Sequence, residues 1–173
     1  MRGAGRLPRP VPGHGWGMPT TPRAEHPVAV VAGGSRGLGL LLAGELAERG
    51  YRVAICGRDK ATLTIAEELL ADDGHHVRVD VCDVGDGEQV DAWISEAEGD
   101  LGPVDVAIPC AGVIQLGPVA SMTREHFREA IDTMLWGPIN LALAVLPGMR
   151  ERGHGRIGTI SSIGGRVAVP HLV

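Results

Sequence analysis

The stretch Ala32-Gly33-Gly34-Ser35-Arg36-Gly37-Leu38-Gly39 decides the fold of this chain. An apolar run at residues 28–31 precedes it and indicates a buried strand of a parallel sheet. Leucines at helical spacing follow it and end near Gly50, which predicts a helix. Glycines let a turn adopt positive φ, and a helix N-terminus offers unpaired N–H groups to a phosphate. The stretch therefore predicts a phosphate-binding loop between a strand and a helix.

Two other interpretations of the same stretch stay open at this point. Residues 33–37 also match the G-x-S-x-G pattern of a serine hydrolase, in which Ser35 would be the nucleophile. That pattern leaves Gly39 without a role. The other interpretation is a plain tight turn that binds nothing.

The rest of the chain alternates between patterns typical of strands and of helices. A capping-box spacing at Asp86 and Gln89 predicts the start of one helix, and a Gly137-Pro138 pair is expected to interrupt another. This rhythm predicts an α/β fold with a doubly wound, Rossmann-like parallel sheet of about five strands, incomplete at its C-terminal edge. The predicted strands are 28–31, 52–56, 77–81, 104–108 and 157–160, and the predicted helices begin near 38, 61, 86 and 123.

Composition divides the chain into a tail and a domain. Residues 1–27 are rich in Gly, Pro and Arg without apolar periodicity, which predicts a disordered tail whose first 17 residues are dispensable, with Met18 as the physiological start. Residues 28–173 form the predicted nucleotide-binding domain.

A formal charge of -5 argues against a nucleic-acid partner. No continuous apolar run reaches the roughly 18 residues of a membrane span. Three cysteines without C-x-x-C spacing favour the cytoplasm, and no metal-ligand pattern is present.

Several stretches resemble the short-chain dehydrogenase/reductase family. Residues 32–39 are similar to its T-G-x-x-x-G-x-G loop, with Ala in place of Thr. Asp83-Val84 resembles its adenine-contacting pair, and Pro109-Cys110-Ala111-Gly112 stands where the family has N-N-A-G. The strand with Ser161-Ser162 resembles the one that carries the active-site serine, which aligns with Ser162. With the two arginines discussed next, the expected cofactor-binding residues are Gly33, Ser35, Arg36, Gly37, Leu38, Gly39, Arg58, Asp83, Val84, Cys110, Ala111 and Gly112.

Two arginines indicate which dinucleotide the loop would bind. Arg58 follows the second strand, at the place where an acidic residue would accept a hydrogen bond from the ribose 2′-OH of NAD. An arginine there accommodates the 2′-phosphate of NADP, and Arg36 can supply a second guanidinium. The sequence therefore predicts NADP (NADPH) as the cofactor.

The resemblance implies an oxidoreductase that interconverts an alcohol and a carbonyl, with a small-molecule substrate. In that family a Tyr and a Lys in Y-x-x-x-K follow the serine by about a dozen residues. Here the one tyrosine is Tyr51 and the one lysine is Lys60, and the sequence ends at Val173. We therefore expect a truncated, inactive member. The alternative is a non-catalytic dinucleotide-binding module.

The family also has an active-site Asn where this chain has Met134. The resemblance implies that this residue acts through its backbone carbonyl. Pro138 has no N–H to donate to the carbonyl of Met134, so we predict a kinked helix with that carbonyl unpaired and directed toward Ser162. An uncovered strand at 157–160 predicts self-association through the sheet edge or through the long helix.

Overall fold

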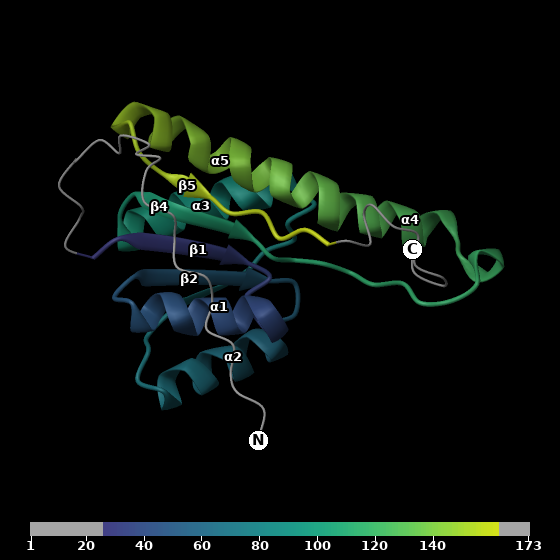
Figure 1. Cartoon of the computed structure of the whole chain (residues 1–173), viewed down its shortest axis with the longest axis horizontal. Helices are drawn as coiled ribbons and strands as arrows, with labels where there is room; N and C mark the ends of the chain where they lie inside the picture. The colour runs from purple at the N-terminus through teal and green to yellow at the C-terminus, as the bar shows by residue number, and fades with distance from the viewer. Residues whose placement is uncertain (1–25, 163–173) are drawn as a thin grey trace, which may run out of the picture.

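The computed structural model describes residues 26–162. These residues form a sheet of parallel strands in the order β3-β2-β1-β4-β5, with helices on both faces (Figure 1). The predictions for residues 1–25 and 163–173 lie outside the described residues. The strands are β1 (Val28–Ala32), β2 (Arg52–Gly57), β3 (Arg78–Val81), β4 (Val104–Pro109) and β5 (Arg156–Ile157). The helices are α1 (Gly37–Glu48), α2 (Lys60–Asp72), α3 (Gly87–Leu101), η1 (Val119–Ser121), α4 (Arg124–Ile131), η2 (Asp132–Trp136) and α5 (Gly137–Arg152).

Alternating residues of the central strand face two separate hydrophobic cores. Val30 belongs to the core that is covered by α3 and α5, whereas its neighbour Val31 belongs to the core under α1 and α2. Every residue of β1 is buried, as expected for a strand with helices on both sides. This arrangement confirms the predicted α/β fold and its parallel sheet.

Helix α3 shows how one predicted helix differs in detail from its sequence pattern. Its apolar face, which includes Val90 and Trp93, is buried. The Asp86 side chain caps the helix by accepting from the N–H groups of Glu88 and Gln89. The reciprocal half of the capping box is different, because the Gln89 side chain accepts from the N–H of Asp83 instead. The helix ends at Leu101, and Gly102 follows it with a φ of 92°, in the left-handed region.

The expected interruption near Gly137-Pro138 takes the form of a π-turn, and the helix does not end there. Helices α4 and α5 run on as one helical segment, and the turn before Pro138 is a π-helical turn in which the Gly137 N–H donates to the carbonyl of Asp132. A π-turn widens the helix by one residue, which accommodates a proline that has no N–H of its own. The helix therefore continues through Pro138 and does not end there.

This unbroken helix also changes one conclusion drawn from composition. The segment Arg124–Arg152 contains an 18-residue window with a mean hydropathy of 1.3, so by length and composition it could cross a membrane. The expectation that no segment is long and apolar enough is therefore wrong. One face of the segment, with Leu141, Val145 and Met149, packs into the core beside β4 and α3. Covering the sheet accounts for the apolar character of that face.

The two ends of the sheet are covered less completely than the centre. At one edge, β3 is half-buried, except that Val81 is exposed. At the other edge, β5 spans two residues instead of the predicted four, and Gly158 adds one more hydrogen bond to β4. Ile157 and Ile160 remain 38% and 45% exposed. The apolar residues of this last strand thus lie on the surface of the described structure.

Candidate functional site

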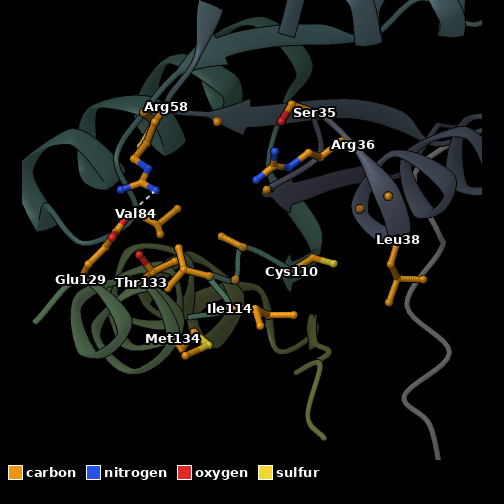
Figure 2. A pocket seen from close by; sticks show the side chains of 18 of the residues that line it. Ser35, Arg36, Leu38, Arg58, Val84, Cys110, Ile114, Glu129, Thr133 and Met134 are labelled. Carbon is orange, nitrogen blue, oxygen red and sulfur yellow. Dashed lines mark hydrogen bonds and ion pairs between the residues drawn. The ribbon is translucent and has the colours of Figure 1, made fainter. Parts of the chain in front are cut away.

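A cavity of about 770 Å³ opens at the carboxyl ends of β1, β2 and β4 (Figure 2). In doubly wound sheets, ligands bind at the point where the strand order reverses, which here lies between β1 and β4. The walls come from the glycine loop, from the loops after β2, β3 and β4, and from the helix α4–η2. The expected cofactor residues Gly33, Ser35, Arg36, Gly37, Leu38, Gly39, Arg58, Val84, Cys110, Ala111 and Gly112 all line it.

The three motif glycines have different surroundings in the loop. Gly33 has a φ of 81°, and a Cβ there would lie 2.5 Å from the Cα of Ala111. A Cβ on Gly39 would lie 2.1 Å from the carbonyl oxygen of Gly33, so α1 packs directly on the turn. Gly37 has a φ of 56°, lines the cavity and would meet nothing within 4 Å. Two glycines therefore close the loop, and the third leaves its backbone open toward a ligand.

The N-terminus of α1 fits the pyrophosphate of a dinucleotide. Arg36 is the N-cap residue in extended conformation, and its side chain makes no capping hydrogen bond. The first N–H groups of a helix have no partner within the helix, and the helix dipole favours an anion there. No acidic residue lies in the first turn of α1. The backbone and the charge distribution thus match an anionic group in this part of the cavity.

The loop after β2 brings together the groups expected at the adenosine ribose. A Cβ on Gly57 would lie 3.2 Å from the Ser35 hydroxyl oxygen, so the two loops touch. The guanidinium groups of Arg36 and Arg58 both extend into the cavity (Figure 2). The nearby Asp59 instead caps α2, and the hydrogen bond from the Thr62 N–H lowers the pKa of its carboxyl. The carboxylate of Asp59 therefore accepts a hydrogen bond from its own helix, α2.

The loop after β3 is held by two side chains, Asn140, which the sequence analysis did not single out, and Gln89, which it expected only in a capping box. Asn140 of α5 donates to the carbonyl of Val84 at 2.9 Å, and Gln89 of α3 accepts from the N–H of Asp83 at 3.0 Å. The Asp83 carboxylate accepts from the N–H of Gly85. Val84 lines the main cavity, whereas Asp83 lies in an adjoining recess with Arg58. Hydrogen bonds to a loop carbonyl 56 residues away leave no local signal in a sequence.

Cysteines line two sides of the cavity. Cys110 follows β4, its N–H donates to the carbonyl of Ala32, and burial raises the pKa of its thiol. Cys82 follows β3, and the hydrogen bond with the Cys56 thiol lowers its pKa. Burial raises the pKa of Cys56 well above its usual value. Across residues 26–162, no cluster of three or more His, Cys, Asp or Glu side chains could hold a metal ion.

Of the two residues expected to take part in the reaction, Met134 and Ser162, one lines the cavity. Met134 lines the cavity from η2, next to Thr133, which is buried although it is polar. Ser162 is exposed and is not one of the described residues that line the cavity. The predicted orientation of the Met134 carbonyl toward Ser162 stays a prediction. No His or Asp occurs among the described lining residues, so the hydrolase interpretation lacks its partners for Ser35.

The sequence of the chain matches known proteins over most of its length. The family described as short chain dehydrogenase matches residues 27–173. An acetoacetyl-CoA reductase of Paracoccus denitrificans is 38% identical over 141 residues, which are 80% of this chain and 56% of that protein. The granaticin polyketide synthase putative ketoacyl reductase 1 of Streptomyces violaceoruber is 36% identical over 152 residues, 87% of this chain and 56% of that protein. The chain thus spans about half the length of these relatives.

Solved structures give the same result for the fold. A variant of actinorhodin polyketide ketoreductase with NADPH is 33% identical, with a TM-score of 0.80 over 84% of this chain and 57% of that one. A metagenomic short-chain oxidoreductase in complex with NADP is 31% identical, with a TM-score of 0.76 over 83% of this chain and 65% of that one.

Proposed function

Because the chain belongs to the short-chain dehydrogenase family, we propose that its whole protein is an NADP-dependent oxidoreductase that interconverts an alcohol and a carbonyl. One observation carries the choice of cofactor: the side chains of Arg36 and Arg58 both line the cavity, and the nearby Asp59 caps its own helix. Two guanidinium groups match the charge and the hydrogen-bond geometry of a 2′-phosphate. Solved relatives with bound NADPH or NADP support this choice.

In this proposal the chain's own residues bind and orient the cofactor. The first turn of α1 holds the pyrophosphate through backbone N–H groups, and the open backbone at Gly37 lets it approach. Asn140 keeps the loop of Val84 in place against the adenine end. The bound cofactor would supply a hydride for the carbonyl carbon. Ser162 is proposed to donate a hydrogen bond to the substrate oxygen, and the Met134 carbonyl to hold a water molecule of a proton relay.

The proposed substrate is a small carbonyl compound of the ketoacyl type. This rests on the relatives, which are named acetoacetyl-CoA reductase and ketoacyl reductase. We propose a cytoplasmic location, which the cysteine spacing favours. Self-association would use the exposed apolar residues of β5 or of the long helix, such as Ile157 and Leu143.

The second candidate function is a dinucleotide-binding module without turnover. One observation favours it for these 173 residues: Tyr51 is the one tyrosine and Lys60 the one lysine, and neither lines the cavity. A phenol with a usual pKa near 10 needs a nearby cation to exchange protons at neutral pH. Ser162 alone does not provide that exchange. We therefore propose that the 173-residue chain binds NADP(H) but does not complete the reaction.

One experiment separates these functions. The purified 173-residue chain is titrated with NADPH and then assayed with acetoacetyl-CoA and a panel of other carbonyl compounds. Binding without oxidation of NADPH supports the binding module, and steady turnover supports an enzyme within these residues. Absence of NADPH binding would overturn both functions.

A further inference from the structure

The geometry points to Glu129 as a residue that sets how strongly this site prefers a nucleotide with a 2′-phosphate. The inference rests on the proposed NADP site and adds to it a carboxylate that competes with the phosphate for Arg58. Sequence analysis did not single out Glu129, because it lies 71 residues from Arg58 along the chain.

The Glu129 carboxylate is held by two side chains that reach it from other segments. Arg58, in the loop after β2, donates from Nη2 to Oε1 at 3.0 Å. Gln115, in the loop after β4, donates from Nε2 to Oε2 at 3.3 Å. All three residues line the main cavity, and the bond between Arg58 and Glu129 joins its two sides (Figure 2). The carboxylate therefore occupies the guanidinium that the proposed 2′-phosphate would use.

The surroundings of Arg58 make this competition specific to one carboxylate. The adjoining recess is lined by Arg58 together with Asp83, Glu125, Glu129 and Asp132. Within the described residues, Glu129 is the one whose carboxylate forms an ion pair with Arg58, whereas Glu125 pairs with Arg128 at 3.6 Å. Glu125 lies one turn earlier on α4 and carries the same charge. It therefore serves as a matched control for Glu129.

The exposure of the pair indicates that a ligand can open it. The side chains of Arg58 and Glu129 are 49% and 39% exposed, and ion pairs of this kind are weak. A 2′-phosphate must break this pair to reach the Arg58 guanidinium. A nucleotide with a free 2′-OH does not meet this cost, because it can leave the pair intact. Glu129 thus lowers the affinity for phosphorylated nucleotides selectively.

The test uses the full 173-residue chain and two nucleotides that differ in the 2′-phosphate, 2′,5′-ADP and 5′-AMP. Isothermal titration calorimetry at fixed ionic strength gives both dissociation constants. We expect Glu129→Gln to tighten 2′,5′-ADP about threefold, the scale of an exposed ion pair, and to leave 5′-AMP unchanged. Glu125→Gln should change either constant by less. A thermal melt of each variant confirms that it is folded.

A double-mutant cycle shows whether Glu129 acts through Arg58. In the Arg58→Gln background, Glu129→Gln should no longer tighten 2′,5′-ADP, because the guanidinium for which Glu129 and the 2′-phosphate compete is absent. The inference is overturned if the gain persists in that background, if it is equal for 5′-AMP, or if Glu125→Gln produces the same gain. If the wild-type chain binds neither nucleotide, the proposed NADP site fails together with this inference. If it binds 2′,5′-ADP and Glu129→Gln changes nothing, the inference alone fails.

Discussion

The cofactor end of the cavity and its reaction end are built in different ways. The cofactor end is one continuous stretch, from β1 through the glycine loop and α1 to the tip of β2. Its backbone closes on itself, as the contact between Gly39 and Gly33 shows. The proposed reaction end combines distant segments, the loop after β4 and the helix α4–η2–α5, while Ser162 is not among the described residues that line the cavity. The reaction end includes Cys110 and Met134, at which the resemblance to the family implies asparagines.

This difference shows which part of the function the described residues are built to carry. The glycine loop is held by backbone contacts, from Gly39 to Gly33 within the loop and from Gly33 to Ala111 after β4, and all of these contacts lie within the described residues. A reaction site made of distant segments depends on every one of them being in place. Cofactor binding should therefore be robust in this chain, whereas chemistry should depend on residues beyond the cavity described here.

The largest effect is expected from Gly39→Ala. The new Cβ would overlap the carbonyl oxygen of Gly33, so α1 must move away from the turn. Overpacking of this kind costs about 1–3 kcal/mol, and the displaced first turn can no longer hold the pyrophosphate. We expect NADPH affinity to fall at least about thirtyfold, as measured by fluorescence titration, since about 2 kcal/mol corresponds to that factor.

Two other glycines serve as controls for that substitution. Gly37→Ala and Gly50→Ala both place a side chain at positive φ in open space, so each pays a similar cost in backbone strain. Gly37 lines the cavity and Gly50 does not. We expect Gly50→Ala to lower stability but not NADPH affinity, and Gly37→Ala to weaken binding less than Gly39→Ala. Equal losses in all three variants would contradict the assigned roles of the glycines.

The next effect concerns the choice between dinucleotides. Arg58→Ala removes a guanidinium from the proposed 2′-phosphate site, and hydrogen bonds to charged groups contribute about 1.5–3 kcal/mol. We expect NADPH to bind about tenfold more weakly or worse, while the dissociation constant of NADH stays the same. An unchanged NADPH affinity would remove the basis for assigning the 2′-phosphate to this arginine.

A smaller effect is expected from removing the hydrogen bond between α5 and the loop after β3. Asn140→Ala deletes the hydrogen bond from α5 to the carbonyl of Val84, which leaves a partly buried acceptor without that partner. Such a loss costs about 1–3 kcal/mol. We expect the urea midpoint to fall and NADPH affinity to drop a few-fold. As a control, Thr64→Ala removes an exposed hydroxyl of α2 that bonds only within its own helix turn, and both readouts should stay near wild type.

The smallest structural change concerns the π-turn. Pro138→Ala restores an N–H that can donate to the carbonyl of Met134, whereas Met134→Leu changes only the side chain. In a protein lengthened to include a Y-x-x-x-K segment, we expect Pro138→Ala to lower turnover more than Met134→Leu. Equal turnover in the two variants would show that the Met134 carbonyl plays no part in the reaction.

The strand, glycine turn and helix could be predicted from the sequence because their signals are local. The pattern of Gly33, Gly37 and Gly39 between an apolar strand and a helix defines a backbone shape within eight residues. Contacts between distant segments were not predicted, since the pairing of Glu129 with Arg58 or of Asn140 with Val84 leaves no periodicity. The π-turn before Pro138 was not predicted, because a proline commonly ends or kinks a helix and the sequence does not show that the Gly137 N–H donates to the carbonyl of Asp132.

We propose that the 173-residue chain binds NADP(H), although the residues for the reaction come from distant segments of the protein. Calorimetric titration of the wild-type chain with NADPH and with NADH at the same ionic strength tests it most directly. The account predicts one site per chain and an NADPH dissociation constant at least about tenfold below that of NADH, the scale of a charge-assisted hydrogen bond. Equal dissociation constants for the two cofactors, or no heat of binding with either, would contradict it.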